Sequence, residues 1–98
     1  MSHYLQTFKE LLKKYLKGNL IGNKFYKAFS KYFYDETLKP QNAKEFNIIE
    51  NLWGYLDIYE SNKKKRAGYD VLIGDDRLRG IIEEALEKMK KLEEKGEK

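Results

Sequence analysis

The apolar residues of this 98-residue chain recur at intervals of three and four in four separate segments, the spacing of one face of an α-helix. In the first segment Leu5, Phe8, Leu12 and Leu16 follow this spacing, and lysines occupy the other faces. Such stripes are buried by packing helices against one another, so the pattern predicts an all-α fold, an antiparallel four-helix bundle. We expect a single helical domain over residues 1–98, with helices at about 3–17, 22–34, 42–60 and 75–94 and a long loop at 61–74.

Local signals mark where these helices begin and end. Gly18-Asn19 is a helix stop, because both residues tolerate the left-handed conformation that ends a helix. Asn42 and Glu45 have the spacing of a capping box, in which each side chain bonds a backbone N–H at the start of a helix. Asp75 or Asp76 is expected to cap the last helix.

The composition argues against catalysis. The chain has no cysteine and only one histidine, His3, so it has no thiolate metal site and no nucleophile paired with a histidine base. Its glycines are scattered and form no phosphate-binding loop. We therefore expect no enzymatic activity, no cofactor and no metal.

The chain also shows no long apolar run and no signal peptide at its N-terminus. We expect a cytoplasmic protein that does not bind a membrane.

Charge is distributed unevenly along the chain. Residues 1–34 carry seven lysines against the single Glu10, whereas residues 35–60 carry six acids against two lysines. The lysines of the first two helices have two interpretations: a face that binds nucleic acid, or a solvated surface, which we favour because arginine and known recognition motifs are absent there.

The acids form a second candidate site. Glu50, Asp57 and Glu60 are spaced by seven and three, which would place them on one face of a helix that continues to residue 60. Asp70 follows in the loop, and Tyr59 adds a residue type that is frequent at interface hot spots. An ordinary charged surface would give the same composition.

Several segments in order resemble one known family. They are Lys17-Gly18, Phe25 to Phe33, Glu45-Phe46, Leu56-Asp57-Ile58-Tyr59, Arg66, Tyr69-Asp70 and Leu78-Arg79. In this order and spacing the chain resembles the colicin D immunity proteins, small proteins that neutralise bacterial ribonuclease toxins. Members of that family are acidic overall, whereas this chain has a net charge of +4 and concentrates its acids in its middle third.

The resemblance implies a four-helix antiparallel bundle that blocks the catalytic cleft of a toxin with acidic side chains. Asp57, Glu60 and Asp70 would imitate RNA phosphates, and Glu50 and Tyr59 would support them. The expected partner is thus the ribonuclease domain of a protein toxin, of the type that cleaves tRNA, and not nucleic acid; the chain would be a monomer or a weak dimer. Two alternatives stay open: a nucleic-acid-binding helical module that uses the Lys-rich face, or a structural bundle that homodimerises through Tyr26, Tyr34 or Trp53.

Overall fold

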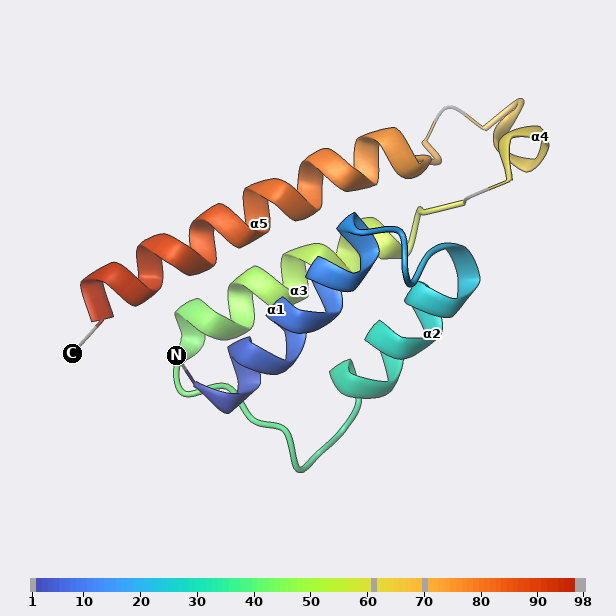
Figure 1. Ribbon diagram of the computed structural model, residues 1–98. Coiled ribbons are helices and arrows are strands. Elements are labelled where there is room, and N and C mark those ends of the chain that lie inside the picture. Colours follow the sequence, from blue (N-terminus) through green and yellow to red (C-terminus); the bar gives the residue numbers. More distant parts are fainter. Residues whose placement is uncertain (1, 61, 70, 97–98) are drawn as a thin grey trace.

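A computed structural model describes residues 2–60, 62–69 and 71–96 and shows a helical molecule (Figure 1). The all-α prediction is confirmed. The described residues form five helices: α1 (His3–Leu16), α2 (Gly22–Phe33), α3 (Ala43–Leu56), α4 (Lys63–Arg66) and α5 (Asp75–Gly96). The first two helices and the last agree with the sequence prediction to within one or two residues.

The four long helices share one hydrophobic core. α1 packs against α2 and α5, and α3 packs against the same two helices. Side chains from all four helices are almost fully buried, among them Phe8, Leu12, Phe25, Phe29, Ile49, Leu52, Leu78, Ile82 and Met89. The short helix α4 contributes no buried residue and lies at one end of the molecule (Figure 1).

The end of α1 shows why a local signal was sufficient there. Gly18 has a φ of +80°, a conformation that residues with a Cβ rarely adopt. The N–H of Gly18 donates to the carbonyl of Tyr15, and the N–H of Asn19 donates to the carbonyl of Lys14. This pair of bonds is the Schellman motif, which satisfies carbonyls that the helix end would otherwise leave unpaired.

The start of α3 is a modified capping box. The side chain of Asn42 accepts the N–H of Glu45, as predicted. The carboxylate of Glu45 accepts the N–H of Gln41 rather than that of Asn42, and it also accepts the hydroxyl of Ser2. Glu45 is 4% exposed, so these bonds replace the water that the carboxylate loses on burial and join the beginning of α1 to that of α3.

The prediction that the third helix continues to residue 60 is wrong. α3 ends at Leu56 because the chain after it pairs with the segment before α5. The N–H of Ile73 donates to the carbonyl of Ile58 at 2.8 Å, and the N–H of Glu60 donates to the carbonyl of Ile73 at 2.9 Å. Tyr59 and Ile73 thereby form an isolated parallel β-bridge, and the intervening loop holds α4.

Candidate functional site

A hollow of about 560 Å³ opens where α3 ends, and three of the predicted site residues line it. These are Asp57, Tyr59 and Glu60; the other lining residues are Asn23, Tyr26, Leu56, Asn62 and Lys65. We call this hollow the α3-end cleft. Its walls come from α2, from the end of α3 and from the loop that carries α4, so it exists only in the folded chain.

Hydrogen bonds hold the segment that carries the acids of the α3-end cleft. Asp57 is the C-terminal cap of α3 and is exposed. Glu60 is half-buried, and its carboxylate accepts the N–H of Asn62 at 3.0 Å. With its own N–H bonded to Ile73, Glu60 is held at both backbone and side chain, which orients its carboxylate before any partner arrives.

Arg66 holds the backbone of Glu60 in place. Its Nη1 donates to the carbonyl of Glu60 at 2.7 Å. The guanidinium also packs against Gly74 so closely that a Cβ there would lie 2.5 Å from Cζ of Arg66. A Cβ at position 74 would force the end of the Arg66 side chain to move, and Arg66 is a structural residue rather than a free cation.

The hydroxyl of Tyr59 is bonded within the chain. It donates to Oδ1 of Asp75 at 2.6 Å, and the hydroxyl of Tyr15 donates to the same oxygen at 2.6 Å. Asp75 thus joins α1, the segment after α3 and the start of α5. The expectation that Asp75 or Asp76 caps α5 is wrong, because the side chain of Asp75 serves the two tyrosines, and the carbonyl of Gly74 accepts the first helical bond, from Leu78.

The environment of Asp75 disfavours ionisation of both tyrosines. Burial, followed by the hydrogen bond to Asp75 and the charge of Asp75, raises the pKa of Tyr59 to about 12 from its usual 10, while bonds from Gly22 and Tyr15 act in the opposite direction. Burial is also the largest cause that raises the pKa of Tyr15, and the bond to Asp75 is the next. Both hydroxyls therefore remain donors at neutral pH.

Glu50 does not belong to the α3-end cleft. It is exposed, and its charge acts together with that of Glu45 on Tyr4 of α1, where burial is the main cause that raises the pKa to about 12. The prediction that Glu50, Asp57 and Glu60 share one helical face is wrong because only Glu50 lies within α3. Asp70 lies outside the described residues.

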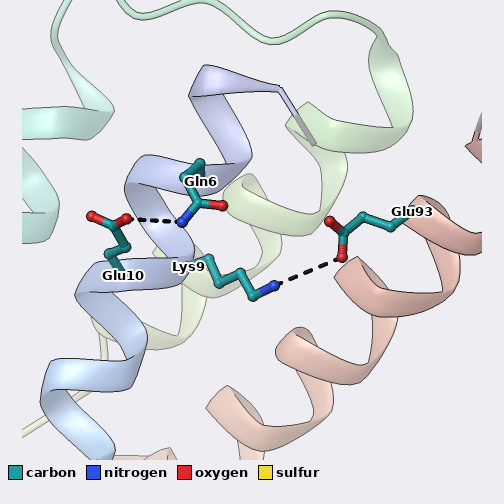
Figure 2. Close-up of polar contacts among 4 residues, drawn as sticks. All are labelled: Gln6, Lys9, Glu10 and Glu93. Carbon is teal, nitrogen blue, oxygen red and sulfur yellow. Dashed lines mark hydrogen bonds and ion pairs between the residues drawn. The ribbon is translucent and has the colours of Figure 1, made fainter.

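The acids of the α3-end cleft are not neutralised by the lysine beside them. Among the described residues, the ion pair within 4 Å is the one that Lys9 of α1 makes with Glu93 of α5, at 3.7 Å (Figure 2). Lys65 lines the cleft with Asp57 and Glu60 but forms no such pair with either of them. The two carboxylates are thus available to an external cation.

Asn23, Tyr26, Asn62 and Lys65 complete the α3-end cleft and were not predicted as site residues. Asn23 and Tyr26 belong to α2, and no sequence pattern indicates that their helix reaches residues 57–60. Asn62 could have been predicted as a helix cap, since asparagine is a preferred residue at that position. Its side chain accepts the N–H groups of Lys64 and Lys65 at the start of α4.

In the described parts of the chain, no three His, Cys, Asp or Glu side chains lie close enough together to hold a metal ion. Within those same ranges, no helix has the length and apolar character needed to cross a membrane.

Comparison of the chain with protein-family models, with curated proteins and with solved structures gives no match. A function for the chain is therefore inferred from the geometry of the α3-end cleft and from the sequence resemblance described above.

Proposed function

We propose that the chain is an immunity protein that binds and neutralises a bacterial ribonuclease toxin, of the type that cleaves tRNA, through the α3-end cleft. The observation that carries the proposal is that Asp57 and Glu60 line one open hollow and that neither forms an ion pair with a described residue. A ribonuclease needs a cationic cleft to hold the phosphates of RNA, and two carboxylates would satisfy the cations of such a cleft.

The preorganisation of Glu60 adds to this support. Its backbone bonds to Ile73 and Arg66 and its side-chain bond to Asn62 are already made in the free chain. A partner would therefore not have to order this segment on binding, which lowers the entropy cost of association. The aromatic ring of Tyr26 offers apolar contact area beside the acids.

The proposal includes the finer architecture that the resemblance implies. In it the four long helices form one antiparallel bundle, which is supported by the contacts of each long helix with two others. The protein would act in the cytoplasm, where a toxin that cleaves tRNA meets its substrate, and its lack of cysteine suits that reducing compartment.

The proposal assigns roles to four of the five residues predicted from the sequence; the fifth, Asp70, lies outside the described residues. Asp57 and Glu60 contact the toxin, and Tyr59 holds the cleft in shape through Asp75. Glu50 lies outside this contact.

Inhibition of a purified toxin tests the proposal. The full chain would be mixed with the ribonuclease domain of colicin D and, separately, with any ribonuclease toxin encoded next to its gene, and tRNA cleavage would be followed on a gel. We expect inhibition of one of these enzymes. We expect Asp57→Lys and Glu60→Lys each to weaken it at least about 100-fold, because each puts a cation against a cationic cleft.

Glu83→Lys is the matched control, because it makes the same charge change at an exposed position on α5. It should inhibit as well as the unchanged chain. Full inhibition by Asp57→Lys, or no inhibition of either enzyme, would refute the proposal.

A further inference from the structure

Lys65 is the one cation among the described residues that line the α3-end cleft. Its neighbours in α4, Lys63 and Lys64, do not line it. Among the described residues Lys65 forms no ion pair within 4 Å, although the carboxylates of Asp57 and Glu60 share the hollow with it. The cleft therefore presents one positive and two negative groups that do not neutralise each other.

The backbone that carries Lys65 is tied to the segment that carries the acids. The N–H groups of Lys64 and Lys65 donate to the side chain of Asn62, at 2.9 and 3.4 Å. One residue later, Arg66 donates to the carbonyl of Glu60 at 2.7 Å. The side chain of Lys65 therefore extends from a held point in the wall of the cleft.

Lys65 opposes any partner that offers only cations to the cleft. Like charges that meet at an interface cost free energy, and an ammonium that loses water without gaining an acceptor adds a desolvation cost. A cleft that has only to hold cations would bind them better without Lys65. A carboxylate on the partner, beside its cations, removes both costs.

The chemistry of a ribonuclease provides a reason for such a carboxylate. Cleavage of an RNA backbone requires proton transfer, and Asp and Glu are, with His, among the side chains that enzymes use for it. Cations that stabilise the charge of the phosphate lie beside these groups. The hollow of about 560 Å³ is in the size range of sites that enclose a whole small ligand, so it can take more than one side chain of a partner.

We propose that Lys65 binds a carboxylate of the partner, so that the α3-end cleft selects a toxin whose catalytic cleft carries an acid beside its cations. This inference rests on the proposed function and specifies the chemistry of the partner. Asp57 and Glu60 bind the cations, and Lys65 binds the acid. A toxin without that acid leaves the ammonium of Lys65 unpaired in the contact, which makes Lys65 a specificity residue.

The direction of a charge effect on inhibition tests this role. If the partner offered only cations, Lys65→Glu would strengthen inhibition of tRNA cleavage. If Lys65 binds an acid, Lys65→Glu weakens inhibition at least about 100-fold, and Lys65→Gln weakens it about tenfold. Lys64→Glu is the matched control, because it makes the same charge change one residue away, at an exposed position outside the cleft. It should inhibit at least as well as the unchanged chain.

A pair of small probes tests Lys65 without a toxin. Butylguanidinium carries a cation alone, whereas 4-guanidinobutyrate carries the same cation and a carboxylate. In NMR titrations of the full chain, 4-guanidinobutyrate should shift the amide signals of residues 57–60 and 62–65 with a dissociation constant about threefold lower than that of butylguanidinium. Lys65→Gln should abolish this difference, and Lys64→Gln should keep it.

The two experiments separate a failure of this inference from a failure of the proposed function. If the unchanged chain inhibits no toxin, the proposed function fails, and the probes alone decide the role of Lys65. Inhibition by Lys65→Glu that equals or exceeds that of the unchanged chain would overturn the role of Lys65 and leave the proposed function in place. Where no toxin is inhibited, equal affinity for the two probes, or no shift with either, overturns that role as well.

Discussion

Replacing Asp75 by alanine removes the oxygen that two tyrosine hydroxyls share. Tyr15 is 2% exposed, and without the carboxylate its hydroxyl keeps only the longer contact, 3.4 Å, with the backbone carbonyl of residue 75. A bond to a charged acceptor contributes about 1.5–3 kcal/mol, and we take about 2 kcal/mol for Tyr15. Tyr59 is half-buried and recovers part of its bond from water, which leaves about 1 kcal/mol. Asp75→Ala should therefore lower the free energy of unfolding by about 3 kcal/mol.

The neighbouring residue provides the control. Asp76 also lies in the first turn of α5, where an acid is stabilised by the helix dipole by about 0.3–1 kcal/mol. Asp76 is exposed, and no side-chain hydrogen bond is recorded for it among the described residues. Subtracting the effect of Asp76→Ala from that of Asp75→Ala removes the dipole contribution and leaves the two tyrosine bonds.

Urea denaturation followed by far-UV circular dichroism measures both variants. In the unchanged chain, Tyr15→Phe should remove most of the free energy of unfolding assigned above to the Tyr15 bond, about 2 kcal/mol. In the Asp75→Ala background it should cost little, because the acceptor has already gone. The reasoning would be refuted if Asp75→Ala and Asp76→Ala differed by less than about 0.5 kcal/mol, since surface substitutions alone produce effects of that size.

Two further predictions concern the same end of the molecule. Because the folded pKa of Tyr59 is raised to about 12 from 10, folding should lose stability as the pH rises from about 10 to 12, and urea denaturation of Tyr59→Phe should show a smaller loss over that interval. Gly74→Ala should destabilise the chain by about 1–2 kcal/mol in the same assay, because the new Cβ displaces the Arg66 guanidinium from its bond to the carbonyl of residue 60. In the Arg66→Ala background the same substitution should cost almost nothing, because that bond is already absent. Gly80→Ala, whose Cβ would meet nothing within 4 Å in the interior of α5, should instead stabilise the chain by up to about 1 kcal/mol; a loss at position 80 equal to that at position 74 would contradict the assignment.

The sequence predicts the helices well where their limits are set by residues close together in the chain. The end of α1 depends on Gly18 and its two neighbouring hydrogen bonds, and the start of α3 depends on Asn42 and Glu45. Both interactions join residues at most five positions apart, so a local pattern contains them. Apolar spacing likewise identifies the buried residues of α1 and α5.

Prediction fails where a distant segment decides the outcome. Residues 57–60 continue an apolar helical spacing, yet Ile73 takes their backbone hydrogen bonds and ends α3 early. This single pairing moves Glu60 off the helix and out of the helical register of Glu50. Phe46 is a similar case, because its spacing predicts a core residue whereas the seam between α2 and α3 leaves it 36% exposed.

The fate of Asp75 shows a third kind of limit. Its position before an apolar helix is typical of a cap, and nothing in the sequence distinguishes that role from the one it has. Two tyrosines located 60 and 16 residues away in the chain converge on its carboxylate. Such a convergence becomes visible only when all three segments are placed in space.

The short parallel bridge between Tyr59 and Ile73 has a consequence for protein engineering. Because the segments on both sides of α4 are joined by the bonds from Ile73 to Ile58 and from Glu60 to Ile73, the part of the chain between them leaves and returns at the same place. Lengthening an excursion closed in this way costs little, about 0.6 kcal/mol for each doubling of its length. The exposed turn at Gly68-Tyr69 is therefore a suitable place to insert a reporter peptide or an affinity tag without opening the hydrophobic core.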